Sequence, residues 1–379
     1  MLYTMRSSNF IFVLLGLLLC SCGSKEVVER VDTFFTPDEY KIVQPVVDTT
    51  KMLTLEELPI EVFGAQSIAV KDSLLFVSST NKAARASIVS LNTNRVLVQV
   101  APSGRGPSDF GIALTTKQFW YNDRGELIIN TYDSRALKPI NITKSIKEQG
   151  SYIEYSKSYS DIYSHEKYHS NKTVLPLGDD EYFILQKASY RDARECKFFP
   201  SRYIIKTKDE QYDFNLFLDV PISEDDPMLP MKILSDSRLF IKPDLTKIVD
   251  IHLLLDYINI IDLKRRKVTS VIEPNTPCYD QIGKMDLGEN IKNGAFDADV
   301  TDEYILVAYD GRTMNDGWNR KPQWASLRLY DWEGNFIKAA QLPKIGVDKM
   351  AYDVNRKTAY FLNCHEEKIY RCDLSEFME

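Results

Sequence analysis

The sequence predicts an all-β fold, a six-bladed β-propeller with four-stranded blades, and three observations support this fold class. One pattern recurs six times: a short apolar strand, a turn with Asp, Asn or Gly, and a second strand of apolar and aromatic residues. Successive copies start 51 to 65 residues apart, close to the period of four-stranded propeller blades. In addition, 21 Tyr and 18 Phe favour aromatic-rich strands. The copies start at Ser67, Gln118, Thr173, Arg238, Gly294 and Asp348.

A second hairpin follows most copies, which gives four strands in each period. It is clearest from Ala86, Tyr257 and Ser326. Copy three continues less regularly, with RYIIKTKDEQYDFNLFLD. Copy two continues with LKPINIT, where Pro139 weakens the third strand because proline favours sheet edges and bulges.

The last copy has only one further strand, KIYRCDL from Lys368, before the chain ends. A closed propeller needs four strands in every blade, so we expect the last blade to be closed by an N-terminal strand from the segment Thr49 to Pro59. Closure hides the sheet edges. The alternative is an open β-sandwich array or two β-domains, since 379 residues could also form two or three domains.

The N-terminus has the layout of a bacterial lipoprotein signal. One cation, Arg6, precedes an apolar run of 11 residues from Phe10 to Cys20, whereas a permanent membrane-spanning helix needs about 20. The sequence Leu-Cys-Ser-Cys that ends at Cys22 resembles a lipobox, so we expect cleavage before Cys22 and lipidation of its thiol. Plain secretion, with cleavage elsewhere and no lipid, is the alternative.

These features predict three parts: a signal peptide over residues 1–21, a tether or linker over 22–48, and the propeller over 49–379. More than one acyl chain holds a protein stably on a membrane, so the expected membrane contact is a lipid anchor. We expect a cell-envelope location at the outer membrane, and the sequence leaves the choice between its periplasmic and surface faces open.

Composition excludes some partners. The net charge is -7 and the pI is about 5.4, without the basic stripe that binding to nucleic acid requires. Only four His residues weigh against a His-rich metal enzyme. We expect no cofactor, no nucleic-acid partner and a monomeric propeller.

Three stretches carry a family resemblance: the lipobox, the first-blade stretch SIAVKDSLLFVSS, and GRGPSDF from Gly104 to Phe110. Together they resemble the six-bladed TolB-like or NHL-like propeller lipoproteins of Bacteroides and relatives, with Asp109 where the blade connector usually has Glu. The resemblance spans about Leu53 to the C-terminus and implies a fold and an envelope location. It brings no catalytic residues.

The same connector invites comparison with phosphate-binding loops. No helix signal and no Gly-Lys-Ser/Thr ending follow it, so the interpretation is a tight turn between blades, with Phe110 filling the junction. Arg105 is the residue of this turn that could face a ligand.

The largest insertion within a blade runs from Asp310 to Trp324, and it combines aromatic and polar side chains that suit sugar rings or a partner protein. The alternative is a loop that packs its own tryptophans. A second adaptable surface is expected over residues 144–172, which include five tyrosines. The ligand-binding candidates of the insertion are Arg312, Trp318, Arg320 and Trp324.

His165 and His169 form an H-E-x-x-H string, which on a helix places two imidazoles one turn apart for zinc. The Ser- and Tyr-rich flank is a poor helix, Lys167 occupies an inner position that zinc peptidases keep uncharged, and no third ligand is assigned. These two residues are therefore weak metal candidates. Asp297, Asp299 and Asp302 could bind a metal in the channel, but strand-end acids are more often solvated.

Four cysteines remain in the mature chain: Cys196, Cys278, Cys364 and Cys372. A two-residue turn at Glu366 and Glu367 would pair Cys364 with Ile369, which leaves Cys364 and Cys372 too far apart for a disulfide. Both are expected as free thiols, and the state of Cys196 and Cys278 stays open.

No serine nucleophile motif or Ser-His-Asp order is present, so no catalytic residue is assigned. The sequence predicts a lipid-anchored envelope propeller that binds a protein, peptide or glycan partner. The alternative is a metal-dependent hydrolase or lyase with its site on the propeller axis. A structural role in an envelope complex comes third.

Overall fold

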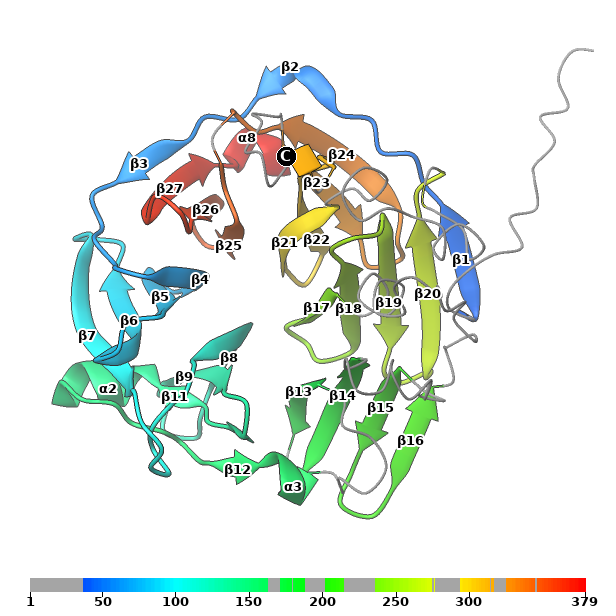
Figure 1. The fold of residues 1–379 in the computed structure, drawn as a ribbon. Coiled ribbons are helices and arrows are strands. Elements are labelled where there is room, and N and C mark those ends of the chain that lie inside the picture. The colour runs from blue at the N-terminus through cyan, green and yellow to red at the C-terminus, as the bar shows by residue number, and fades with distance from the viewer. Residues whose placement is uncertain are drawn as a thin grey trace, which may run out of the picture. The chain divides into compact units, whose positions relative to one another are not determined.

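The strands form six sheets that stand around a common centre as the blades of a six-bladed β-propeller (Figure 1). The predicted fold class is confirmed, and each of the six sequence copies supplies the first two strands of one blade. The first strand of every blade faces the centre of the ring. The computed structural model describes residues 37–162, 171–178, 180–187, 202–214, 236–274, 276, 294–313, 315–316, 325–344 and 346–379.

Four blades are regular antiparallel meanders, in which neighbouring strands follow one another along the chain. Their second and third strands are mostly apolar, because each blade is covered by another blade on both faces. Blade 1 contains β4 (Ala65–Lys71), β5 (Leu74–Ser79), β6 (Ala84–Ser90) and β7 (Arg95–Pro102). Blade 3 contains β13 (Asn171–Gly178), β14 (Glu181–Lys187), β15 (Tyr203–Lys206) and β16 (Gln211–Phe214). Blade 4 contains β17 (Ser237–Ile241), β18 (Lys247–His252), β19 (Tyr257–Asp262) and β20 (Lys267–Ile272). Blade 5 contains β21 (Ala295–Val300), β22 (Tyr304–Tyr309), β23 (Ser326–Asp331) and β24 (Phe336–Gln341).

Turn residues of the expected kind connect the strands. Asp72 and Ser73 form the two-residue turn between β4 and β5, and both have positive φ angles, of 49° and 65°. Two positive φ angles define the turn type whose twist matches paired strands. Aspartate is one of the residues that tolerates this conformation.

Blade 2 departs from the pattern at Pro139. Its third strand is split into β10 (Ala136–Leu137) and β11 (Ile140–Asn141), which pair with the same strand in one register. Proline has no N–H to donate to the ladder, so the weakness expected there is confirmed. The blade contains β8 (Leu114–Tyr121), β9 (Leu127–Tyr132), β10, β11 and β12 (Lys157–Ser158), with the helices α2 (Ile142–Glu148) and α3 (Tyr159–Ile162).

The N-terminal segment closes the last blade, as the sequence predicts. The short strand β3 (Glu56–Leu58) lies antiparallel beside β27 (Lys368–Asp373) and provides the fourth strand of blade 6. Arg371 pairs with Glu56, and Leu58 is buried against the blade. The other strands of blade 6 are β25 (Lys349–Asp353) and β26 (Thr358–Asn363), and the short helix α8 (Ser375–Met378) follows β27.

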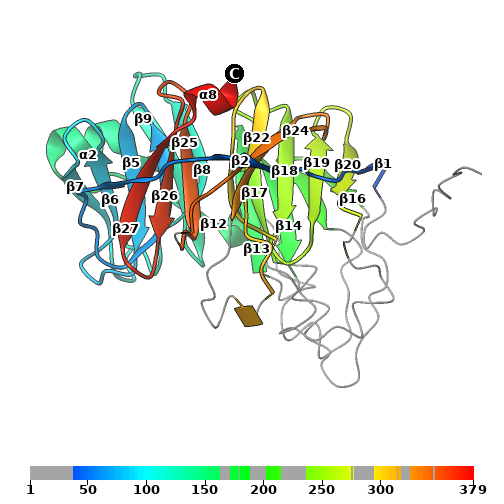
Figure 2. The ribbon, with the colours of Figure 1, turned by 90° about the horizontal axis from the view of Figure 1, so that it is seen from above.

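Two further N-terminal strands pair with blade edges, one of them wholly within the segment that the sequence assigns to the tether. Strand β1 (Glu39–Ile42) lies parallel to β20, and β2 (Asp48–Met52) lies parallel to β24. Figure 2 shows this strap, formed by β1, β2 and β3, running along the outside of the ring. The chain therefore joins the propeller already at Glu39, ten residues before the expected boundary at 49.

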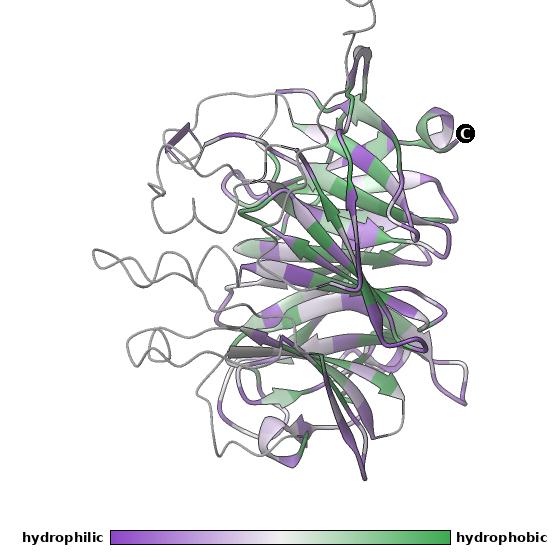
Figure 3. Ribbon diagram, turned by 90° about the vertical axis from the view of Figure 1, so that its right-hand side faces the viewer, coloured by the Kyte–Doolittle hydropathy of each residue, from purple (hydrophilic) through white to green (hydrophobic). Residues whose placement is uncertain are grey.

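The hydrophobic core is divided among the junctions between blades. Separate clusters of buried side chains lie between blades 1 and 2, 2 and 3, 4 and 5, 5 and 6, and 6 and 1. Figure 3 shows apolar residues concentrated along the strands of the blades. The junction of blades 3 and 4 contains a buried polar network around Arg202 and Asp250.

Candidate functional site

A central recess of about 350 Å³ opens at one face of the ring, where the first strand of each blade begins. We call this face the recess face. Side chains at or near the starts of the six innermost strands line it, together with the residues that lead into β8 and β17. Its volume lies in the range of small-molecule sites. The lining includes Gln66, Thr173, Asp236, Arg238, Asp297 and Lys349.

A bulge in β8 forms the floor of the recess. Thr116, Lys117 and Gln118 stand opposite the single residue Asn130 of β9, so the strand bends towards the axis. The amide of Asn130 fills the bulge and donates to Thr116 Oγ1 at 2.9 Å. Lys117 has a φ of 59°, a conformation that is uncommon for a long side chain. The bulge thereby aims Lys117 across the channel.

The Lys117 ammonium bridges from blade 2 to blades 5 and 6. Its Nζ donates to Asp297 Oδ2 at 2.9 Å, to the Ala298 carbonyl at 2.6 Å and to the Met350 carbonyl. The side chain is 7% exposed, and Phe240 stacks below its charge. Lys117 also lines a smaller cavity of about 110 Å³ at the opposite end of the channel. It therefore lies between the two cavities.

Asp297 is the electrostatic centre of the floor. Its carboxylate is 1% exposed and also accepts from Arg238 at 2.7 Å and from the Met350 N–H at 2.8 Å. Burial by itself raises the pKa of Asp297, but the charges of Lys117, Arg238 and Lys349 outweigh burial and bring the pKa to about 2. Asp297 is therefore ionised at any physiological pH.

Lys349 is the third cation of the recess. It begins β25 and is half-buried. Burial, and next the neighbouring Arg238 charge, lower the pKa of Lys349 below its usual value. No hydrogen bond or ion pair within the described chain holds its ammonium.

Asp299, on the far side of Lys117, has a different environment. Its carboxylate accepts from the backbone N–H groups of Val300 and Tyr352 at 2.9 and 2.8 Å. Burial raises the pKa of Asp299. Asp297 and Asp299 are thus buried and hydrogen-bonded, which corrects the expectation of solvated strand-end acids, whereas Asp302 is exposed in a turn. Within the described residues, no group of three His, Cys, Asp or Glu side chains is placed to hold a metal ion.

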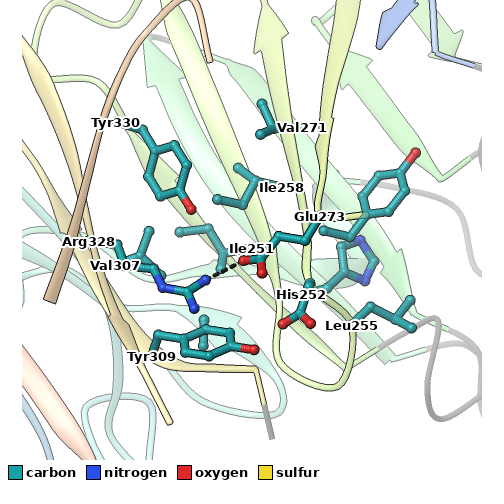
Figure 4. Close-up of a pocket in the computed structure, with 13 residues that line it drawn as sticks. Ile251, His252, Leu255, Ile258, Val271, Glu273, Val307, Tyr309, Arg328 and Tyr330 are labelled. Atoms are coloured by element: carbon teal, nitrogen blue, oxygen red, sulfur yellow. Dashed lines mark hydrogen bonds and ion pairs between the residues drawn. The ribbon is translucent and has the colours of Figure 1, made fainter. Parts of the chain in front are cut away.

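A third cavity, between blades 4 and 5, is much smaller. Figure 4 shows Arg328 reaching Glu273, with the Tyr309 ring beside its guanidinium. The guanidinium carbon lies 3.3 Å from the centre of the Tyr309 ring. The cavity of about 20 Å³ has room for a single water molecule. This pocket joins two blades and is too small for a ligand.

Arg105 lies on the recess face, because the connection from β7 to β8 crosses that face. The connector is the predicted tight turn: Ser103 bridges to Phe110, Asp109 accepts from the Gly106 N–H at 2.8 Å, and Phe110 is fully buried. The Arg105 side chain is exposed and is not part of the recess lining.

Arg312 follows β22, also on the recess face, and its Nε donates to both carboxylate oxygens of Asp310 at 2.7 and 2.9 Å. The other candidates of that insertion, Trp318, Arg320 and Trp324, lie outside the described residues. The same is true of Cys22, His165, His169, Cys196 and Cys278.

Cys364 and Cys372 are free thiols, as expected. The register that led to this expectation was wrong. Asn363 pairs with Lys368, so the turn spans residues 364–367 and Cys372 lies opposite Ala359. A four-residue turn forms here because the Asn363 side chain accepts from two backbone N–H groups of the turn.

Lys117, Arg238 and Lys349 were not recognised as site residues from the sequence. Each sits inside or beside an apolar strand, and their side chains converge only when the ring closes. A lysine or arginine within the first strand of a repeat is a signal that could have pointed to the channel, since that strand faces the centre of the ring.

The similarity to one solved structure supports the fold. A crystal structure of a DUF4221 family member from Bacteroides vulgatus is similar with a TM-score of 0.54 and 10% identity, over 87% of this chain and 97% of that chain. A Bacteroides fragilis protein that is thought to be exported gives a TM-score of 0.49 at 10% identity, over 88% and 98% of the two chains. The calcium-binding protein regucalcin from Agrobacterium tumefaciens gives 0.42 at 10% identity, over 87% and 95%.

No protein-family model matches this sequence, and neither does any curated protein. At 10% identity, the DUF4221 structure shows the shared propeller fold alone. No helix in the described part of the chain is long and apolar enough to cross a membrane.

Proposed function

We propose that this protein is a binding module of the cell envelope, anchored to a membrane by a lipid on Cys22, which takes a protein, peptide or glycan partner at the recess face. One observation carries the proposal: the ring encloses a central recess of about 350 Å³ with a charged floor. A preformed concave site with a few convergent polar groups is the usual form of a binding site.

The loops that surround the recess also support the recess face as the binding surface. Strand directions bring the connections between successive blades, and those between the second and third strand of a blade, to the recess face. Arg105 and Arg312 belong to these two kinds of connection. Binding residues commonly lie on loops that a rigid scaffold positions. The blades form that scaffold here.

Blocking the recess is expected to abolish binding. Gln66 is exposed at the rim, so Gln66→Trp fills the opening without disturbing the core. We expect the lipidated protein, purified in detergent, to bind members of a glycan or peptide array, and Gln66→Trp to lose at least about tenfold in affinity for them. Val354→Trp is the matched control, because Val354 is exposed beside the cavity at the opposite end of the channel.

Equal array binding by Gln66→Trp and the native protein would place the binding surface elsewhere. Empty arrays, together with turnover of a substrate by the purified protein, would support the enzyme alternative instead.

The lipid anchor has its own test. Cys22→Ala is expected to move the protein from the membrane pellet to the soluble fraction, because it removes the thiol that carries the acyl chains. Cys20→Ala is the matched control, since Cys20 lies two residues earlier in the same segment, and it should stay in the pellet. Unchanged fractionation of Cys22→Ala would favour plain secretion.

A further inference from the structure

The floor of the recess holds more positive than negative charge. Among the described residues that line the recess, Lys117, Arg238 and Lys349 are the cations, and Asp297 and Asp236 are the anions. Lys117 occupies one oxygen of Asp297, and Arg238 occupies the other. Both oxygens of Asp297 thus already accept from a charged donor, and no hydrogen bond joins Lys349 to Asp297 in the described structure.

Two cations keep donors that face the recess. Arg238 uses one terminal nitrogen for Asp297, its side chain is 30% exposed, and no partner within the described residues takes its other nitrogens. Lys349 lines the same cavity and is half-buried. A guanidinium and an ammonium with free donors suit a carboxylate, which accepts two hydrogen bonds at once.

Neutral and acidic side chains line the rest of the recess, which we call its wall. Asp236 precedes β17, Thr173 belongs to β13 and Gln66 belongs to β4. An Asp carboxylate, a hydroxyl and an amide together accept from and donate to alcohol groups. A second carboxylate near Asp236 would instead be repelled. The wall thus favours hydroxyl groups, and the base favours one anion.

We propose that the central recess binds a hydroxylated monocarboxylate of the uronic acid class, with its carboxylate on Arg238 and Lys349 and its hydroxyl groups toward Asp236, Thr173 and Gln66. This inference rests on the proposed function, since it assigns a ligand class to the same face. If the partner is an oligosaccharide, its acidic sugar enters the recess and its other sugars lie on the recess face.

The test uses isothermal titration of the lipidated protein in detergent at constant ionic strength, with sodium glucuronate and glucose as probes. Glucuronate is expected to bind at least about tenfold more tightly than glucose. Lys349→Met should weaken glucuronate about ten- to hundredfold, because a hydrogen bond to a charged group is lost, and should leave glucose unaffected. Lys349 is the preferred variant because it makes no hydrogen bond or ion pair with another described residue.

Lys71→Met is the matched control, since Lys71 is an exposed lysine beside the cavity at the opposite end of the channel, and it should bind glucuronate as the native protein does. An unchanged melting temperature shows that the Lys349→Met variant is folded.

Four results would overturn the inference. The first two are equal affinity for glucuronate and glucose, and unchanged glucuronate affinity in Lys349→Met. The other two are no glucuronate binding at all, and binding of N-acetyl-dialanine, which has a free carboxylate, instead of glucuronate. In each case the proposed function still stands if Gln66→Trp loses array binding, and it fails with the inference if the arrays are empty.

Discussion

The Lys117→Met variant is expected to lose about 3 kcal/mol of unfolding free energy. The Lys117 ammonium is 7% exposed and pairs with an Asp297 carboxylate that is 1% exposed. Removing one partner of a buried ion pair costs about 3–5 kcal/mol, because the remaining charge keeps its desolvation cost. We place the loss at the lower end because Arg238 still pairs with Asp297. Denaturant unfolding followed by circular dichroism measures it.

Lys82→Met is the matched control, because Lys82 is exposed, and it should change the unfolding free energy by less than about 0.5 kcal/mol. A similarly small effect in Lys117→Met would show that the channel floor is not held by this contact.

The unfolding free energy of the Lys117→Met variant should depend less on acid pH than that of the native protein. The pKa of Asp297 is lowered from 3.8 to about 2, so its ionisation stabilises the native protein above pH 4, and this stabilisation is lost as pH falls towards 2. At about 1.4 kcal/mol per pKa unit, the contribution is about 2 kcal/mol. The charged groups around Asp297 are Lys117, Arg238, Lys349 and Asp299.

Without Lys117 the pKa of Asp297 rises, so Lys117→Met should lose less stability between pH 4 and pH 2 than the native protein does. Parallel losses in the two proteins would contradict the assignment of this acid dependence to Asp297.

Arg202→Met is expected to cost about 3–5 kcal/mol, the largest effect of any single substitution proposed for this protein. The Arg202 and Asp250 side chains are both fully buried, with nitrogen–oxygen distances of 3.0 and 2.8 Å. The Tyr203 hydroxyl donates to the same Asp250 oxygen at 2.6 Å. Burial by itself raises the pKa of Asp250, but Arg202 and next His252 outweigh it and lower the pKa. Loss of Arg202 therefore leaves a buried carboxylate without its main counter-charge.

Arg265→Met is the matched control, since Arg265 is 78% exposed and stands 3.9 Å from Asp262. Exposed pairs contribute about 0–1 kcal/mol, so its unfolding should be almost unchanged. The double variant Arg202→Met with Asp250→Leu should recover most of the lost stability, because neither charge is then buried. Failure of the double variant to recover would assign the cost to lost packing between blades 3 and 4.

The repeat in the sequence was sufficient to predict the six blades. Each copy combines two apolar strands with a turn that carries Asp, Asn or Gly. Such strand and turn signals can be recognised from neighbouring residues along the chain, without knowledge of the tertiary contacts. The missing strand of the last copy likewise predicted β3, because every blade needs four strands and the last copy supplies only three. The position of Phe110 at a blade junction was also predicted correctly, because a large apolar side chain after a tight turn needs a buried position.

The strap strands β1 and β2 could not be predicted in this way. Their residues are mostly exposed, so neither strand shows an apolar period. They form because the outer edges of blades 4 and 5 offer backbone groups that need partners. The helix α2 was missed because it is only seven residues long, and its start depends on the Asn141 cap.

The sequence by itself determined the number of blades, their order and the closure at β3, because strand period and turn chemistry are local properties that repeat along the chain. Only the tertiary structure decided the site. Lys117, Arg238, Asp297 and Lys349 come from blades 2, 4, 5 and 6. Their charges meet on the axis because the ring brings the innermost strands together, and burial there then sets their pKa values and pairings.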